Sequence, residues 1–88
     1  MTYLQTNQHL MVTVNEVYRK IKEMSAQEWT PRPVLTVVNL SSALRSPREA
    51  LIPLLTELQE LKLIRFNDNN KVSVKLTLLG NNVERSKL

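Results

Sequence analysis

The side chains that could carry out chemistry in this chain are few, and their spacing matches no catalytic or metal-binding motif. The one histidine, His9, falls on the first turns of an expected helix, where a lone histidine is usually a surface residue. There is no cysteine, and the acidic residues between positions 49 and 68 lack the spacing of a metal-binding loop. The only glycine is Gly80, so a glycine-rich phosphate cradle is excluded. We therefore expect no enzyme activity, no catalytic residue, no cofactor and no bound metal.

The basic side chains are the more informative group. Twelve lysines and arginines oppose eight acidic residues, which gives a net charge of +4 and a pI of about 9.8. This balance suits a polyanionic partner, although many small proteins carry such a charge for solubility alone. The aromatic residues are too few and too scattered for a single-strand binder. We expect Trp29 and Tyr18 to pack in the core or at its edge.

The length and composition fit one globular domain over residues 1–88. The chain is 42% hydrophobic and 23% charged, as ordinary soluble proteins are. No apolar run approaches the ~18 residues of a membrane span, and residues 1–10 do not have the pattern of a secretory signal. Together with the absence of cysteine, these features predict a cytoplasmic protein without a membrane partner.

A long amphipathic helix is expected over residues 6–28. Apolar residues recur three and four apart from Leu10 through Val14 and Tyr18 to Met24, which is the helical period. The helix should end near Trp29, because Pro31 and the proline after it cannot continue a helix. A short extended segment is expected at residues 33–35.

Two short helices are expected over residues 36–61, joined by a turn at 45–46. The Thr36 hydroxyl can cap the first helix, whose inward face is expected to include Ala43. The run Ser46-Pro47-Arg48-Glu49 has the pattern of a capping box with proline at the first helical position. It therefore predicts the start of the second helix.

The second helix is expected to run to Leu61, with Leu61 and the other leucines turned inward. Pro53 lies inside it and removes one backbone hydrogen bond, so we expect a kink or a loosened first turn.

Residues 63–76 have the pattern of a two-stranded hairpin. Residues 63–66 and 72–76 alternate apolar and polar side chains, as half-buried strands do. The connection over residues 67–71 is rich in Asn and Asp, which tolerate the left-handed backbone of tight turns. Thr77 can cap a last short helix over residues 77–84, in which Gly80 is unfavourable.

This succession of elements resembles the winged helix-turn-helix transcription regulators of bacteria, notably the PadR and MarR types. The match rests on Ala50-Leu51-Ile52-Pro53-Leu54-Leu55-Thr56-Glu57-Leu58-Gln59-Glu60-Leu61-Lys62-Leu63-Ile64. A similar leucine, aromatic, proline pattern and exit into the wing occur in PadR-type recognition helices. Leu76-Thr77 followed by Gly80 resembles the strand end of the MarR type. The resemblance covers about residues 35–83. It implies an α+β winged helix-turn-helix, a small helical bundle with a two- to three-stranded antiparallel wing in the order α-β-α-α-β-β-α.

The resemblance also implies sequence-specific binding of double-stranded DNA by a small transcription regulator. Residues 47–61 would form the recognition helix in the major groove, and the wing tip at 67–71 would touch the backbone or the minor groove. We also expect a homodimer, because paired half-sites raise affinity and specificity. Its surface would include the start of the opening helix, at Tyr3, Leu4, Leu10 and Met11.

Arg48 would pair with guanine or a phosphate, and Ile52 would touch a thymine methyl group. Arg32 is a further candidate for phosphate contact. The residues expected at the DNA are Thr36, Arg45, Ser46, Arg48, Glu49, Ile52, Thr56, Arg65, Asn69, Asn70, Lys71 and Lys75.

Two features depart from the family pattern. The expected recognition helix carries one arginine against three glutamates, a net charge of −2, whereas such helices are usually basic. Lys62 stands where the family often has glycine, and a left-handed backbone there would be strained. An alternative function therefore stays open, in which a winged helix binds a protein partner through an apolar patch at Ile52 and Pro53 and does not bind DNA.

Overall fold

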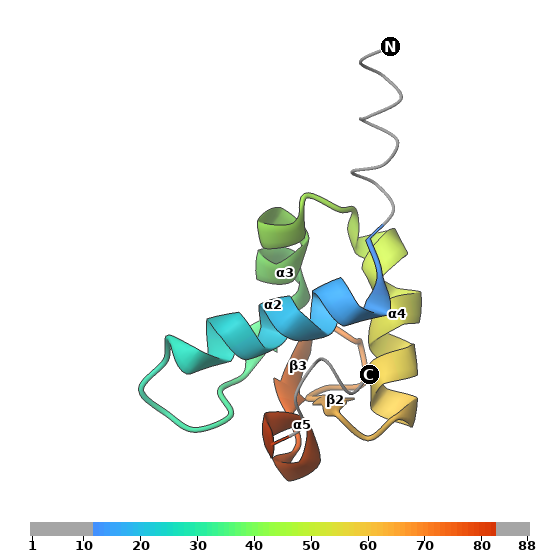
Figure 1. Cartoon of the computed structure of the whole chain (residues 1–88). Helices are drawn as coiled ribbons and strands as arrows, with labels where there is room; N and C mark the ends of the chain where they lie inside the picture. Colours follow the sequence, from blue (N-terminus) through green and yellow to red (C-terminus); the bar gives the residue numbers. More distant parts are fainter. Residues whose placement is uncertain (1–11, 83–88) are drawn as a thin grey trace.

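Helices cover one face of a small antiparallel sheet, and the fold is α+β (Figure 1). The computed structural model describes residues 12–82, and this range holds four helices and three strands. In chain order they are α2 (Val14–Ala26), β1 (Leu35–Thr36), α3 (Val37–Leu44), α4 (Arg48–Glu60), β2 (Ile64–Phe66), β3 (Ser73–Leu76) and α5 (Leu78–Asn82). The order α-β-α-α-β-β-α is the predicted one. No described helix is long and apolar enough to cross a membrane.

The sheet has the strand order β1-β3-β2, so β3 lies in the middle and pairs with both neighbours in the antiparallel sense. The hairpin predicted over residues 63–76 is confirmed. The extended segment near residue 35 forms the third strand of the sheet. Side chains alternate along β3, where Val74 and Leu76 are buried and Lys75 is half-buried between them. The sheet therefore has one apolar face toward the helices and one polar outer face.

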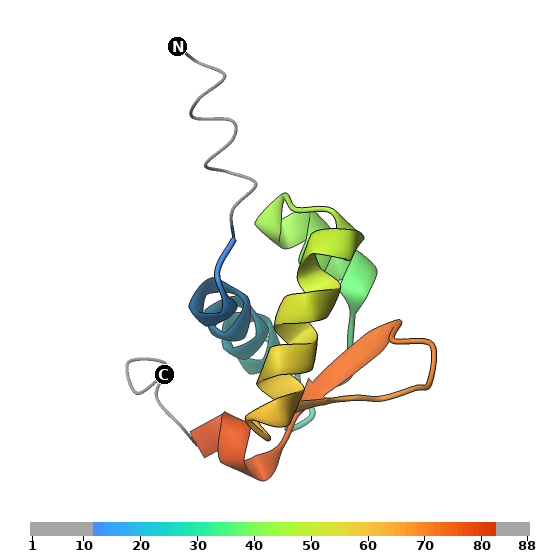
Figure 2. The same ribbon diagram turned by 90° about the vertical axis from the view of Figure 1, so that its right-hand side faces the viewer.

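The core lies between the helices and the inner face of the sheet. Helices α2, α3 and α4 contact one another, and α2 and α4 also contact the strands (Figures 1 and 2). The buried apolar residues form one cluster: Val17, Tyr18, Ile21, Leu35, Val37, Leu40, Leu51, Leu55, Leu58, Leu63, Ile64, Val74 and Leu76. Every described element except α5 contributes a side chain to this core.

Helix α2 is shorter than predicted at both ends. It begins at Val14, because Thr13 is extended and its hydroxyl accepts a hydrogen bond from the Glu16 amide, while the Glu16 carboxylate accepts from the Thr13 amide. This capping box, Thr-x-x-Glu, fixes the helix start. The end at Ala26 precedes the predicted residue 28. The predicted helical stretch over residues 6–11 and the side chains of His9, Tyr3, Leu4, Leu10 and Met11 lie outside the described residues.

The start of α3 agrees with the prediction, but the start of α4 does not. The Thr36 hydroxyl accepts a hydrogen bond from the Asn39 amide and caps α3 as expected. At α4, however, Pro47 is the N-cap residue and no side chain caps the helix. Ser46 is buried instead, with its hydroxyl directed to the Leu44 carbonyl. The predicted capping box is therefore wrong, because packing of the turn takes Ser46 away from the helix end.

Two side chains expected in the core are exposed. Ala43 lies on the solvent side of α3, since only Val37, Leu40 and partly Leu44 face inward on this eight-residue helix. Leu61 is the C-cap residue of α4 and is 47% exposed. Helix α4 continues through Pro53, which is exposed. The helix tolerates this proline because the lost hydrogen bond would go to the carbonyl of Glu49, which solvent can reach.

Gly80, which is unfavourable for a helix, is required by packing. A Cβ atom at this position would lie 1.8 Å from the carbonyl oxygen of Leu63, so only glycine lets α5 approach the loop before β2. The Tyr18 hydroxyl donates a hydrogen bond to the Gly80 carbonyl, which ties α5 to α2. Thr77 caps α5 as predicted, since its hydroxyl accepts from the Gly80 amide. Residues 83–84 of the predicted helix lie outside the described residues.

Candidate nucleic-acid interface

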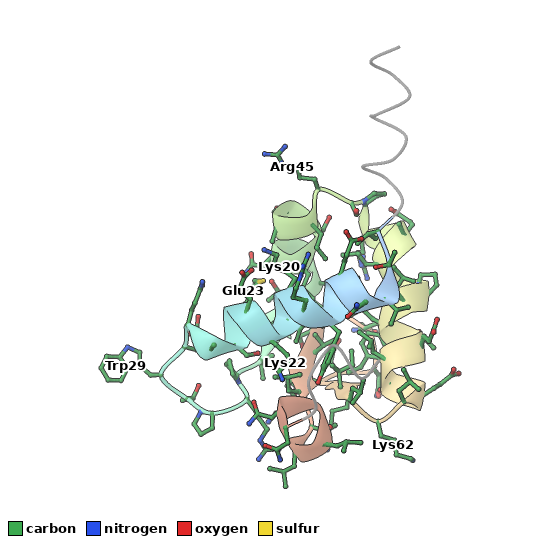
Figure 3. All side chains as sticks on the ribbon, viewed as in Figure 1. Lys20, Lys22, Glu23, Trp29, Arg45 and Lys62 are labelled. Carbon is green, nitrogen blue, oxygen red and sulfur yellow. The ribbon has the colours of Figure 1, made fainter. Side chains whose placement is uncertain are left out.

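The turn between α3 and α4 places Arg45 at the surface. Arg45 has a left-handed backbone with φ 54°, and its amide donates to the Ser42 carbonyl. The next amide, Ser46, donates to the Ser41 carbonyl, and the Ser41 hydroxyl returns to the Ser46 carbonyl. These bonds close the turn and direct the Arg45 side chain into solvent (Figure 3). Ser46, predicted to contact a phosphate, is only 3% exposed, and its hydroxyl donates to the Leu44 carbonyl, so its side chain has little access to a ligand.

The first turn of α4 presents two exposed charged side chains, Arg48 and Glu49. Neither takes part in an ion pair, since the only ion pair within residues 12–82 joins Lys20 and Glu23. Glu49 is also released from the capping role that the sequence predicted. No side chain caps this helix end, and the dipole of an uncapped helix start favours an anion.

Three other predicted contact residues on the helices are less available than expected. The Thr36 hydroxyl is occupied by its cap, although its side chain is exposed. Ile52 packs partly against the core, and Thr56 is half-buried. Ile52 and Thr56 therefore offer a ligand only part of their side chains, and Thr36 is exposed with its hydroxyl committed to the cap. The apolar patch expected at Ile52 and Pro53 is correspondingly smaller.

The hairpin tip is organised by Asp68. Its carboxylate accepts hydrogen bonds from the amides of Asn70, Val72 and Ser73. Burial raises the pKa of the Asp68 carboxyl, but these bonds and one from the Ser73 hydroxyl outweigh it, so the pKa lies below the ordinary value of 3.8. The sequence predicted a turn here without assigning Asp68 this role.

Asn69, Asn70 and Lys71 are exposed at the tip, as predicted. The left-handed residue is Lys71, with φ 58°, and not one of the asparagines. Its ammonium group lies 5.5 Å from the centre of the Phe66 ring, a distance typical of a cation–π contact. Figure 2 shows that the hairpin projects from the body beside α4. The tip therefore offers one cation and two amide side chains at the end of a hairpin whose base lies beside α4.

The remaining predicted residues lie on another face. Arg65 and Lys75 are cross-strand partners on β2 and β3, and their side chains lie on the outer face of the sheet. There they line a cavity together with Arg32. The predicted set is thus divided into two groups. Arg45, Arg48, Glu49 and the tip belong to α4 and the hairpin end, whereas Arg65 and Lys75 belong to the outer sheet face.

Trp29 was expected to pack in the core or at its edge, and this prediction is wrong. The indole is fully exposed on the loop between α2 and β1, and it points away from the body (Figure 3). It lines a second cavity of about 340 Å³ with Arg32 and other residues of this loop, with Ser25 and other residues of α2, and with Asn81 of α5. The prolines at positions 31 and 33 are the sequence signal that a loop, and not a packed element, carries this residue.

Acidic residues of the described chain do not gather into a metal site. No group of three or more His, Cys, Asp or Glu side chains within residues 12–82 could hold a metal ion. Glu57 and Glu60 lie in the last turns of α4 and Asp68 is held in its turn. Comparison with known proteins found no matching family model, no similar curated protein and no similar solved structure.

Proposed function

We propose that this chain is a winged helix-turn-helix that binds duplex DNA in a sequence-specific way, as a small transcription regulator. The observation that carries the proposal is the arrangement of α3, a closed turn, α4 and then a projecting hairpin, with unpaired cations at the start of α4 and at the hairpin tip. In such an arrangement α4 enters the major groove and the tip reaches the neighbouring backbone or minor groove.

Three exposed cations, Arg45, Arg48 and Lys71, have distinct roles in this proposal. Arg48, on the first turn of α4, pairs with a guanine edge or a phosphate, and Arg45 contacts a phosphate from the turn. Lys71 contacts the backbone from the hairpin tip. Asn69 and Asn70 add hydrogen-bonding groups beside it. The main argument in favour is that no carboxylate of the described residues neutralises these cations.

The acidic end of α4 lies away from the groove in this proposal. Glu57 lies nine positions after Arg48, which corresponds to about 14 Å along a helix. Only the first turns of α4 then enter the major groove, as in other helix-turn-helix proteins. Glu57 and Glu60 face solvent or a second protein subunit. A homodimer would place two such helices one DNA turn apart.

A titration with a mixed-sequence duplex at low and at moderate salt tests this proposal. Binding should weaken steeply as salt rises, because phosphate contacts release counterions. Arg48→Ala and Lys71→Ala should each weaken binding and reduce the slope of log K against log salt by about 1. Glu57→Ala is the matched control, since it is exposed on the same helix and should not weaken binding. Absence of binding at low salt would reject the proposal.

The second candidate function is a protein-interaction module. It is favoured by the net negative charge of α4 and by the exposed Pro53 in the middle of that helix. A protein partner would then bind α4, and duplex DNA at low salt would leave the resonances of Arg48 and Lys71 unchanged. The same titration therefore separates the two candidates.

A further inference from the structure

The outer face of the sheet carries a basic cavity that lies apart from α4 and the hairpin tip. Its volume is about 240 Å³, and three cations line it: Arg32 from the loop before β1, Arg65 from β2 and Lys75 from β3. Leu76, Thr77 and Leu78 complete the wall, and no acidic side chain lines it. We propose that this cavity is a binding site for a phosphate group.

The first argument is electrostatic repulsion in the free protein. Arg65 and Lys75 are direct cross-strand partners, and like charges in this position destabilise a sheet. Arg32 adds a third positive charge to the same cavity. Repulsion of this kind is relieved when an anion binds among the three cations. A phosphate group, with up to two negative charges, matches this arrangement better than a carboxylate does.

The second argument is that these cations have no ion-pair partner among the described residues, although Glu28 lines the neighbouring cavity with Arg32. None of the three takes part in an ion pair within residues 12–82. Between residues 61 and 82 the only acidic residue is Asp68, and its carboxylate is committed to the amides of the hairpin turn. The Thr77 hydroxyl at the wall is also committed, since it donates to the Lys62 carbonyl and accepts from the Gly80 amide.

The third argument is the type of the side chains. Two guanidinium groups can each form paired hydrogen bonds to phosphate oxygens, and the ammonium group of Lys75 adds a compact charge between them. Lys75 is half-buried between Val74 and Leu76, so its aliphatic stem is held by the sheet and its charged end is directed outward. The cavity therefore combines a positioned cation in the middle strand with one arginine on either side.

Titration of the protein with inorganic phosphate, at constant ionic strength set with chloride, tests the site. We expect saturable amide shifts in NMR spectra at Arg32, Arg65, Lys75 and Thr77, together with a rise in the unfolding temperature. Lys75→Gln and Arg65→Gln should each weaken phosphate binding by about tenfold, as the loss of a charge-assisted hydrogen bond predicts. Arg19→Gln is the control, because it removes the same charge at an exposed position on α2 that lines neither cavity.

A second measurement separates a binding site from a general charge effect. Lys75→Gln removes repulsion across β2 and β3, so in phosphate-free buffer it should raise the unfolding temperature, and a given concentration of added phosphate should raise it further by less than in the unaltered protein. If no saturable shift occurs at the cavity, or if Arg19→Gln and Lys75→Gln reduce phosphate binding equally, the proposal is wrong. It is also wrong if Lys75→Gln lowers the unfolding temperature in phosphate-free buffer, because the repulsion argument then fails.

The phosphate could come from a small phosphate compound or from a nucleic-acid backbone, and competition distinguishes the two sources. If a duplex displaces inorganic phosphate from the cavity, the site binds backbone phosphates. If a mononucleotide displaces it and a duplex does not, the site binds small phosphate compounds.

The inference that the cavity binds phosphate does not depend on the proposed function. Arg48→Ala should weaken duplex binding and leave phosphate binding at the cavity unchanged, so failure of either proposal is recognised separately.

Discussion

Lys62 occupies a backbone conformation that suits glycine. Its φ is 67°, just after the C-cap of α4, and its amide donates to the Gln59 carbonyl to complete the end of the helix. For a residue with a Cβ atom the left-handed conformation costs about 1–2 kcal/mol. Glycine at this position would avoid that cost, but part of the gain would be offset by the greater freedom of glycine in the unfolded chain. The strain predicted from the sequence at this position is therefore present.

We predict that Lys62→Gly raises the free energy of unfolding by about 0.5–1 kcal/mol. Urea denaturation of the two proteins measures this difference. Lys62→Ala is the control, because it removes the charge and keeps the Cβ atom, and it should not stabilise the fold. Equal stabilisation by both variants would mean that charge, and not backbone strain, is the cause.

Local signals predicted residue roles well where only neighbouring residues take part. The Thr36 cap needs only the amide of Asn39, and it formed as expected. The expected Ser46 cap did not form, although its sequence pattern is as strong. The turn between α3 and α4 buries Ser46, and its hydroxyl donates to the Leu44 carbonyl instead of capping the helix. The missed cap at Thr13 had a clear local signal in Glu16, three residues later.

At the scale of elements, the hairpin tip depends on one carboxylate. The ionised Asp68 side chain accepts from the backbone at Asn70, Val72 and Ser73, which holds the tip in shape. The pKa of this carboxyl is lowered in the folded protein. A lowered pKa means that the stabilising effect is complete above the ordinary value of 3.8 and is lost as the pH falls through the folded value.

We therefore predict that the hairpin tip loosens below pH 3.8, before the helices respond. The amide resonances of Val72 and Ser73 should shift and exchange faster with solvent as the carboxylate is protonated. Asp68→Ala should show the loosened tip already at neutral pH, and its tip should lose most of the pH dependence. If the amides of α3 change at the same pH as the tip, global acid unfolding is responsible instead.

The order and type of the elements were predictable because each element is indicated by apolar side chains that recur at a fixed spacing over a few residues. Leucines three and four apart in α4, and alternation in β2 and β3, depend on segments of a few residues. The limits of α2 were less accurate, since the Thr13 cap lies inside the periodic region and begins the helix there. The exposure of Ala43 also escaped prediction, because it depends on how α3 is turned against its neighbours.

At the scale of the whole molecule, Gly80 joins parts of the chain that are distant in sequence. Its α-carbon lies against the backbone of Leu63, and its carbonyl accepts from the Tyr18 hydroxyl. We predict that Gly80→Ala lowers the free energy of unfolding by about 3 kcal/mol or more, because backbone and not a flexible side chain must move. Thermal or urea unfolding measures this loss.

Asn81→Ala is the control for this variant. Asn81 is exposed on the same helix, so its replacement should change stability by less than about 0.5 kcal/mol. If Gly80→Ala is equally mild, α5 can move away from Leu63 at little cost, and the packing argument for this glycine is wrong.

The division of the candidate site between two faces could not be predicted from the sequence. The cations at positions 45, 48, 65, 71 and 75 look equivalent as a series along the chain. Only the strand order and the register place Arg65 beside Lys75 and on the outer face, away from α4. The same holds for Arg32, which reaches that cavity from a loop three residues before β1.

The middle strand of the sheet, β3, is also the last of the three in the chain. During synthesis β1 and β2 therefore emerge from the ribosome before β3, the strand with which both of them pair. They cannot pair with each other in the meantime, because they are not adjacent in the sheet. The acceptor for the Tyr18 hydroxyl, 62 residues further along, emerges later still. Since contacts of such long separation form together, the nascent chain should fold in one late cooperative step and not helix by helix.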